Sequence, residues 1–209
     1  MIVTSENVKE LLKYITDTFE ENKEELCKYD RAIGDGDHGE SMARGSLEGY
    51  KAVSQLNEDA SVSECFKIYS RTMRATIGGA IGPIFSTVVN EIGKAAKDSG
   101  QIGAEEYAAG LKHAAEKVME LGGAIPGDKT LVDALVPAAE AAGQLKHEDF
   151  EEMAKAVKDA ALEGARNTID MQAKMGRSQF LREKSVGHQD AGATSLFLML
   201  QAIYRFTQL

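Results

Sequence analysis

The segment from residue 30 to residue 39 (DRAIGDGDHG) carries the residues best suited to chemistry, because it holds three aspartates beside three glycines. Asp35 and Asp37 are alternate residues of a glycine-permitted turn, so both side chains can point to one side, and Asp30 can reach them from the end of the first helix. Carboxylates that are brought together repel one another unless a cation lies between them. Oxygen ligands select hard cations, and Mg²⁺ keeps water and phosphate oxygens in its remaining positions. The spacing predicts a magnesium site at Asp30, Asp35 and Asp37, although helix caps and Asx turns use the same residue types.

Two well-known loop types do not fit this segment. Gly34, Gly36 and Gly39 match the dinucleotide pattern G-x-G-x-x-G, but no strand precedes them and two aspartates stand where a pyrophosphate would approach. An EF-hand needs a third Asx ligand, and a bidentate Glu at the position that Ser46 occupies when counted from Asp35. No P-loop pattern occurs in the chain. A metal that reverses the local charge would let this acidic loop bind a polyphosphate.

Other polar residues stand in loops or before helices, where an anion could be held. His38 follows the acidic residues and could donate to a phosphate oxygen, and the Arg177 guanidinium could stabilise a phosphoryl group in transfer. His188 precedes the last predicted helix, whose N-terminus would favour an anion. For each of the three, an ordinary surface contact is the alternative. Residues 127–130 (GDKT) resemble part of a Walker sequence, but an Asp interrupts it, and we interpret them as a helix cap and a wall of the site.

Apolar residues recur at helical spacing along most of the chain. Val8, Leu11, Leu12, Ile15 and Phe19 form the first such stripe. The chain has three prolines and no tryptophan, and no stretch alternates apolar and polar residues for long, so strands are not expected. The spacing predicts eight helices, at about residues 8–19, 42–56, 61–73, 83–92, 104–121, 130–142, 148–171 and 193–206.

Local signals support several of these helix boundaries. Ser61 and Glu64 have the spacing of a capping box at the start of a helix. Pro83 suits a first helical turn, where its missing N–H would have no partner in any case. Gly122 and Gly123 predict a left-handed cap at the end of the helix that precedes them.

Short connections between eight helices favour an antiparallel up-and-down arrangement. In that topology every second connection lies at the same end, and those four connections hold twelve of the twenty glycines. Glycine is useful where the backbone approaches a ligand or adopts positive φ, although single glycines often just end helices. The sequence therefore predicts an all-α, eight-helix antiparallel up-and-down barrel or bundle with a ligand site at one end. No linker or low-complexity segment interrupts it, so we expect residues 1–209 to form a single domain.

Composition narrows the functional classes. Lys and Arg number 24 and Asp and Glu number 33, which gives a net charge of −9 at pH 7 and disfavours direct binding to nucleic acid. No apolar run approaches the roughly 20 residues of a membrane helix, and the N-terminus lacks the features of a signal peptide. Cys27 and Cys65 fit neither a disulfide framework nor a thiolate metal site. We expect a cytoplasmic protein that does not bind membranes.

Five stretches of the chain resemble a known family. Four of them are glycine-containing loops, at 34–39, 78–83, 127–130 and 176–178, and the fifth covers residues 185–195. In this order the chain resembles the ADP-binding L subunits of phosphoenolpyruvate phosphotransferase-dependent dihydroxyacetone kinases. The resemblance implies an eight-helix barrel that holds ADP through two Mg²⁺ ions as a prosthetic group, with ATP as the phosphorylated intermediate. It further implies that the phosphoryl group comes from a phosphohistidine on an M subunit and goes to dihydroxyacetone held on a K subunit.

The resemblance also implies roles for individual residues. Asp30, Asp35 and Asp37 would hold the Mg²⁺ ions, and Arg177 would face the phosphates as the catalytic residue. The other residues implied to line the ADP site are His38, Gly39, Glu40, Ser41, Gly79, Ala80, Ile81, Gly122, Leu131, Asp190, Ala191 and Gly192.

Two positions depart from the pattern of this family. Ile81 replaces a usual serine, which removes a hydroxyl that could meet a phosphate, and Ala191 replaces a usual proline. A second function is therefore kept beside the phosphoryl relay, namely an ADP-binding regulatory module that reports phosphorylation state to a partner protein. A third is an ATP-consuming kinase component whose nucleotide exchanges freely. The acceptor could be a related small ketose, and a homodimer is left open.

Overall fold

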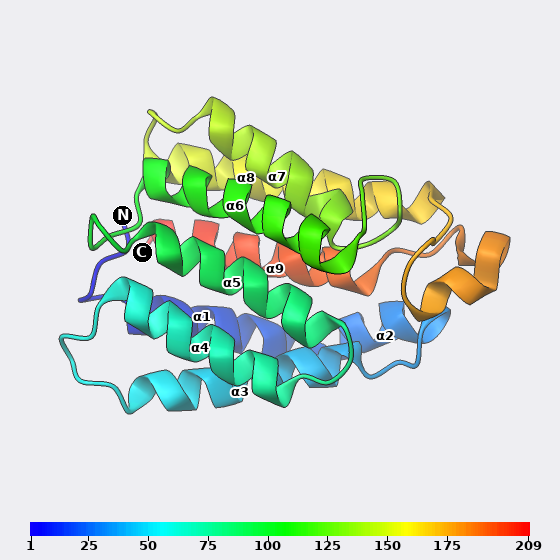
Figure 1. The fold of residues 1–209 in the computed structure, drawn as a ribbon, viewed down its shortest axis with the longest axis horizontal. Coiled ribbons are helices and arrows are strands. Elements are labelled where there is room, and N and C mark those ends of the chain that lie inside the picture. The colour runs from blue at the N-terminus through cyan, green and yellow to red at the C-terminus, as the bar shows by residue number, and fades with distance from the viewer.

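The chain is helical along nearly its whole length in the computed structural model, which describes all 209 residues (Figure 1). In order, its elements are α1 (Val8–Glu21), α2 (Lys23–Ile33), α3 (His38–Ser54), α4 (Val62–Thr76), α5 (Ile81–Ala95), α6 (Ala104–Gly122), α7 (Val132–Gln144), α8 (Phe150–Asn167), the 3₁₀-helices η1 (Thr168–Asp170) and η2 (Arg177–Ser185), and α9 (Ala191–Thr207). An isolated β-bridge joins Val3 to Ile102, and there is no sheet. The predicted all-α class is confirmed. None of the helices combines the length and the apolar character that crossing a bilayer requires.

The prediction of eight α-helices is wrong by one, because the segment after α1 forms the separate helix α2. Only Asn22, at φ −102° and ψ 10°, separates the two helices. Neither glycine nor proline marks this break, so the sequence carries none of the usual signals for the end of a helix there. Asp30 consequently lies in the last turn of α2 rather than at the end of the first helix.

The predicted local signals are present at three helix boundaries. The Ser61 hydroxyl accepts a hydrogen bond from the Glu64 amide (3.2 Å) at the start of α4, but the Glu64 carboxylate does not return a bond to the Ser61 amide, so only half of the predicted capping box forms. Pro83 lies in the first turn of α5, and Gly123 ends α6 in the left-handed region at φ 70°. Short-range chemistry therefore sets these boundaries as expected.

Helices that follow one another from α3 to α9 pack against each other, and α1 packs against both α3 and α9. This closed series of antiparallel helices makes up the body of the molecule, while α2 lies beside it and contacts α3 and α9 (Figure 1). The alternation brings the α2–α3, α4–α5, α6–α7 and α8–α9 connections to one end, at the right of Figure 1. Both termini lie at the opposite end.

A core of 48 buried residues extends along the chain from Val3 to Phe206. Phe19 of α1 and Phe85 of α5 meet edge to face in it, with ring centroids 5.6 Å apart. Removing this much apolar surface from water is the main favourable contribution to folding. The core therefore holds the helices whose ends form the site.

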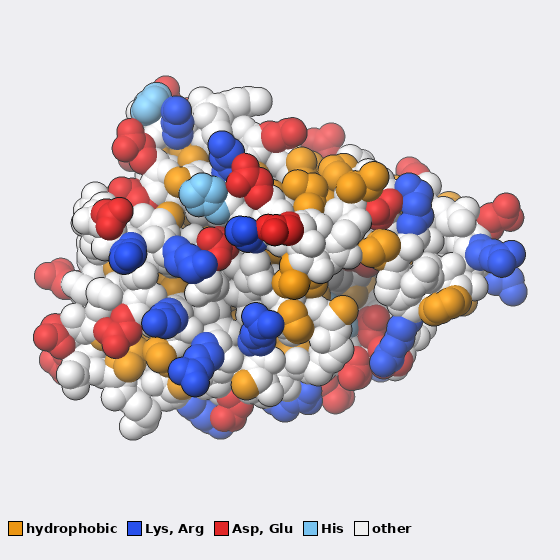
Figure 2. All heavy atoms as spheres, viewed as in Figure 1, with side chains coloured by type: hydrophobic (Ala, Val, Ile, Leu, Met, Phe, Trp, Pro, Cys, Tyr) orange, Lys and Arg blue, Asp and Glu red, His pale blue; other side chains and the backbone are white.

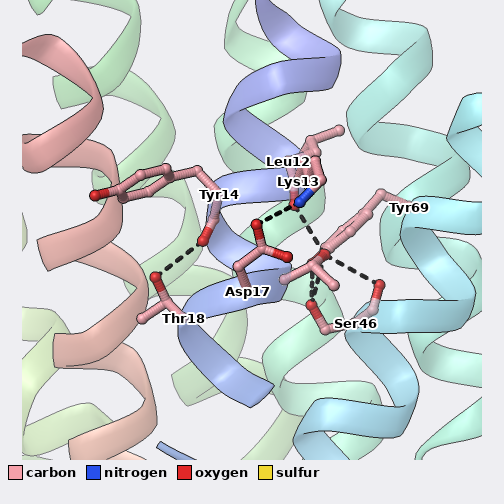
Figure 3. Close-up of polar contacts among 8 residues, drawn as sticks. Leu12, Lys13, Tyr14, Asp17, Thr18, Ser46 and Tyr69 are labelled. Carbon is pink, nitrogen blue, oxygen red and sulfur yellow. Dashed lines mark hydrogen bonds and ion pairs between the residues drawn. The ribbon is translucent and has the colours of Figure 1, made fainter. Parts of the chain in front are cut away.

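Three hydroxyl groups interrupt this apolar core where α1, α3 and α4 meet (Figure 3). Thr16 Oγ1 lies 3.0 Å from Tyr69 OH, and Ser46 Oγ donates to Thr16 Oγ1 (3.0 Å) and also contacts Tyr69 OH. Thr16 in turn donates to the Leu12 carbonyl (2.8 Å). Burial raises the pKa of Tyr69 to about 12, so the phenol keeps its proton at neutral pH. The network ties three helices together without placing a charge in the core.

We expect Tyr69→Phe to lower the free energy of unfolding by about 1–2 kcal/mol, because it deletes a buried hydroxyl that has two partners. Tyr107→Phe is a matched control, since the Tyr107 hydroxyl is equally buried but has no hydrogen-bond partner. That variant should be as stable as the wild type or slightly more stable. Urea unfolding of both variants measures the difference, and equal losses would contradict a stabilising role for the network.

Candidate functional site

The four connections at the right-hand end enclose a cavity of about 1000 Å³, and each of them contributes lining residues. This convergence is the one that the glycine-rich connections predicted. Figure 2 shows hydrophobic side chains gathered over α7 and the α6–α7 connection, with a few more over the nearby ends of α5 and α6. The cavity is therefore the first candidate for a functional site.

Most of the site residues predicted from sequence line this cavity, and they come from all four connections. They are Asp30, Asp35, Asp37, His38, Ser41, Gly79, Ala80, Ile81, Gly122, Leu131, Arg177, Asp190, Ala191 and Gly192.

Gly39 and Glu40 are not among the lining residues. Gly39 is buried against α2, where an added Cβ would lie 2.0 Å from the Lys23 carbonyl oxygen. Its lack of a side chain therefore serves close packing between α2 and α3. Glu40 is exposed to solvent outside the cavity. His188 likewise lies outside the cavity lining, and its ring is exposed.

The three aspartates of the acidic loop come together as their spacing predicts. Asp30, Asp35 and Asp37 each offer a carboxylate oxygen, and these oxygens lie within 4.8 Å of one another. Asp30 also accepts hydrogen bonds from the amides of Gly36 (2.7 Å) and His38 (3.3 Å), which holds the turn in shape. Gly36 occupies φ 83°, a conformation that a side chain would strain.

The donor set fits a hard divalent cation. Asp37 is the N-cap residue of α3, yet its carboxylate accepts no capping hydrogen bond, so capping does not explain this residue. Asp35 and Asp37 are exposed, and all three ligands are oxygen atoms. Mg²⁺ is bound in this way by a few carboxylates, with water and phosphate oxygens in the other positions.

Arg177 lies in the α8–α9 connection and contacts the acidic loop. It is the first residue of η2, follows Gly176 at φ 63°, and forms an ion pair with Asp35. The Arg177 side chain is 70% exposed, so it lies at the mouth of the cavity rather than in its floor. The Asp35 carboxylate could bind a metal ion and the Arg177 guanidinium could bind a phosphate. In this structure the two groups pair with each other.

His38 faces the interior of the bundle. Its Nε2 atom lies 2.7 Å from Ser195 Oγ of α9, and its ring is 8% exposed. Burial lowers the pKa of His38 to about 4, so the ring is neutral at pH 7. His38 therefore joins α3 to α9 and reaches the cavity without a positive charge.

First-turn residues of four helices line the cavity. The lining includes residues at the start of α3, α5, α7 and α9, namely His38, Ile81, Val132 and Ala191. Amides in the first turn of an α-helix have no partner within the helix and can donate to an anion. The His38 amide already donates to Asp30 and the Val132 amide to Thr130 Oγ1 (3.1 Å), whereas the amides of Ile81 and Ala191 have no partner. This end of the bundle therefore combines N–H donors at the start of α5 and α9 with a cluster of carboxylates.

Apolar side chains form a wall of the cavity as well. Ile81, Ile84, Val118 and Leu131 belong to it. A Cβ added at Gly192 would lie 3.7 Å from Leu131 and 3.8 Å from Ile81, so these two side chains lie beside the start of α9. Such a surface suits a flat apolar group, whereas the aspartates suit a charged one.

Residues 127–130 form a cap and a wall, as interpreted from the sequence. The Asp133 carboxylate accepts hydrogen bonds from the amides of Gly127 (2.5 Å) and Thr130 (2.7 Å). Lys129 and Thr130 line the cavity. The Lys129 amine, however, donates to the carbonyls of Thr168 and His188. It is therefore not available to bind a phosphate.

Several lining residues escaped prediction, and two of them carry side chains that could bind a ligand or a partner. Arg44 of α3 is exposed, lines the cavity and donates to Ser41 Oγ (3.3 Å), one helical turn earlier. That i, i+3 spacing from a predicted site residue was the available signal. Phe180 of η2 lines the cavity mouth and is 81% exposed, but an aromatic residue in a loop gives no such signal.

The family follows from a match to a model of the DAK2 domain, which covers residues 32–205. The chain belongs to the DAK2 domain family. It is 36% identical over 194 residues to the PEP-dependent dihydroxyacetone kinase, ADP-binding subunit DhaL, of Escherichia coli, and the match covers 90% of each chain. It is also 36% identical over 184 residues to D-erythrulose kinase of Mycolicibacterium smegmatis, covering 87% of this chain but 32% of that protein.

A solved structure supports the fold. The crystal structure of the dihydroxyacetone kinase from C. freundii aligns with a TM-score of 0.72 at 22% sequence identity, covering 95% of this chain and 33% of that one. The chain thus belongs to a family of phosphotransferases, as its motifs predicted. It spans about a third of the longer relatives and nearly all of the subunit from E. coli.

Asp190 links the cavity to the start of α9. Its carboxylate accepts a hydrogen bond from the Ala193 amide (2.7 Å), and its own amide donates to Thr168 Oγ1 (2.9 Å). Burial raises the pKa of Asp190 to about 6, against the opposing effects of the Ala193 amide and the Lys129 charge. Near neutral pH the Asp190 carboxylate is therefore ionised although burial disfavours its charge, and this lowers the stability of the folded protein.

A raised pKa in the folded state contributes stability that is present below the unfolded value and is lost as the pH rises through about 6. We therefore expect Asp190→Asn to gain about 1 kcal/mol in unfolding free energy relative to the wild type between pH 5 and pH 7.5. Urea unfolding across this range tests the expectation. Asp149→Asn, at the exposed N-cap of α8, reports the cost of an ordinary cap substitution. A relative stability that stays flat or falls with pH would contradict it.

Proposed function

We propose that this chain is a phosphotransferase component that binds Mg–ADP in the cavity and relays a phosphoryl group between two other proteins. The donor would be a phosphohistidine on a partner subunit, and the acceptor would be dihydroxyacetone or a related small ketose held on a second partner. The observation that carries the proposal is the meeting of three carboxylates, an arginine and an apolar wall in a single cavity. The ADP-binding subunits among the relatives support the nucleotide, and their name as kinase subunits supports the transfer.

The polar side of the cavity suits the diphosphate. Asp30, Asp35 and Asp37 would hold two Mg²⁺ ions, which supply neutralisation of the phosphate charge when they are bound. Occupation of the Asp35 carboxylate would release Arg177 from its ion pair, so that the guanidinium could turn to the transferred group. Phosphoryl transfer depends chiefly on such positioning and charge stabilisation, and the chain needs no nucleophile of its own.

The remaining walls suit the rest of the nucleotide. The first turns of α3, α5 and α9 would donate backbone N–H groups to phosphate oxygens. The apolar wall at Ile81, Ile84 and Leu131 would cover the adenine. Ile81 provides hydrocarbon where the family pattern has a hydroxyl, so the phosphate contact there would come from the backbone alone.

The acceptor would have to arrive on another polypeptide or another domain. Subunits such as the one from E. coli match this chain over nearly their whole length, whereas D-erythrulose kinase carries the matching region as about a third of a longer chain. The erythrulose kinases among the relatives also support four-carbon ketoses as an acceptor class. Dihydroxyacetone and erythrulose are therefore the first substrates to test.

One assay separates the relay from the regulatory alternative. The chain is incubated with a phosphohistidine donor protein of the phosphoenolpyruvate phosphotransferase system, a dihydroxyacetone-binding subunit and dihydroxyacetone. Formation of the sugar phosphate supports the relay. Retention of ADP after dialysis, without any sugar phosphate, would favour the ADP-binding regulatory module, and free exchange of nucleotide with net ATP consumption would favour the exchanging kinase.

We expect Asp35→Asn and Asp37→Asn each to weaken Mg–ADP binding by at least about tenfold, because each removes one charged ligand from the oxygen cluster. Isothermal titration calorimetry with ADP, with and without Mg²⁺, measures the effect. Asp17→Asn is the control, since Asp17 pairs with Lys13 on the surface of α1 (Figure 3). If Asp35→Asn and Asp37→Asn bound as tightly as Asp17→Asn in the presence of Mg²⁺, the metal assignment would be wrong.

Phe180 offers a test of partner contact at the cavity mouth. Its side chain is 81% exposed, and the segment 174–184 around it carries four basic residues and one acidic residue in a chain of net charge −9. We expect Phe180→Ser to lower turnover at limiting partner concentration at least about fivefold, since exposed aromatic side chains commonly anchor interfaces. Mg–ADP affinity should change less than twofold. Leu47→Ser, on the outer face of α3, is the control for loss of an exposed apolar side chain. Turnover equal to that of the control would contradict docking at this edge.

A further inference from the structure

Lys129 is an unusual residue for its position. It lies in the α6–α7 connection, its side chain is 1% exposed, and its backbone adopts φ 61° in the left-handed region. Non-glycine residues seldom occupy that region, and amines are seldom buried so completely. Both features cost stability, and local strain of this kind persists where the surrounding structure uses it.

The amine bridges two other segments of the chain. Lys129 Nζ donates to the carbonyl oxygens of Thr168 and His188. Thr168 is the C-cap residue of α8, where a positive charge also interacts favourably with the helix dipole. His188 lies in the segment that leads into α9. A single side chain from the α6–α7 connection thus holds both ends of the α8–α9 connection.

One of these contacts is linked by a further hydrogen bond to a residue that lines the cavity. Thr168 is fully buried, and its hydroxyl accepts the hydrogen bond from the Asp190 amide (2.9 Å). Asp190, Ala191 and Gly192 line the cavity on one side, and Thr130 and Leu131 line it beside Lys129. The amine therefore helps to set the separation of the first turns of α7 and α9, together with the hydrogen bond from the Gly187 amide to the Ile169 carbonyl (2.7 Å).

A second contact between the same connections provides a comparison. Lys174 pairs with Asp128 (3.1 Å), and the Lys174 side chain is 59% exposed. This pair joins the α6–α7 and α8–α9 connections at the surface, and neither residue lines the cavity. The Lys174 amide also donates to the Asp128 carbonyl (3.1 Å), so the backbone joins the two connections at this point as well. Exposed ion pairs contribute little to stability, so the buried amine is the stronger of the two side-chain links.

We propose that Lys129 is a positioning residue of the nucleotide site, whose amine sets the start of α9 against the start of α7 and is not itself a phosphate ligand. This inference rests on the proposed function for its ligand, Mg–ADP. It assigns the GDKT stretch a role distinct from that of a Walker lysine, because the amine is committed to two backbone carbonyls.

Lys129→Met keeps the length of the side chain and removes its donors, and Lys174→Met is the matched control. Calorimetry with Mg–ADP is carried out well below the unfolding temperature, with helix content verified by circular dichroism. We expect the dissociation constant of Lys129→Met to rise at least about tenfold and that of Lys174→Met to stay within about twofold. Hydrogen–deuterium exchange of residues 186–194 should become faster in Lys129→Met and should not change in α4.

The outcomes separate positioning from simple stabilisation. A lower unfolding temperature with wild-type affinity and unchanged exchange at 186–194 would overturn the proposal. If Lys129→Met does not fold, Thr168→Val, which removes the acceptor of the Asp190 amide, decides the question by the same two measurements. If the wild type itself does not bind Mg–ADP, the proposed function is wrong, while the local exchange rates still show whether Lys129 holds the start of α9.

Discussion

The alternation of helix direction is the constraint on which the rest of this structure depends. Because neighbouring helices run antiparallel, the first turns of α3, α5, α7 and α9 must all lie at one end. Amides that have no partner within their own helix thereby meet around one cavity, where Asp30 accepts from His38 and Thr130 accepts from Val132. The same alternation brings the last turns of the preceding helices to this end, so their free carbonyls need donors of their own. The Gly123 amide serves Met119 at the end of α6, and Lys129 serves the end of α8.

Charge at this end is partly offset within the chain. Three carboxylates converge in a protein that is already strongly acidic. The Asp30 carboxylate also accepts hydrogen bonds from backbone amides of its own turn. Arg177 offsets Asp35 from the opposite connection. Carboxylates and a guanidinium therefore lie side by side, which is an arrangement suited to the proposed ligand, since that ligand combines a metal with phosphate.

Local features of the fold and site were predictable from sequence, because they depend on residues near one another in the chain. The stripe from Val8 to Phe19, the cap at Ser61 and the aspartate cluster are of this kind. Features that depend on packing between distant segments were not. The break at Asn22 carries no glycine or proline, so α2 was missed, and with it the reason for Gly39, which packs against α2 instead of lining the cavity. The carbonyl partners of Lys129 lie 39 and 59 residues away, beyond the reach of any motif.

The position of the two termini has a consequence for how such a domain can be joined to others. The N-terminal amine donates to the Thr207 carbonyl (3.2 Å), so both ends of the chain emerge together, at the end of the bundle away from the cavity. A tether from either end would have to run back along the helices, a distance of about 25 Å for one the length of α9, before it could reach the opening. Fusion partners or affinity tags can therefore be attached at both termini while access to the opening stays free.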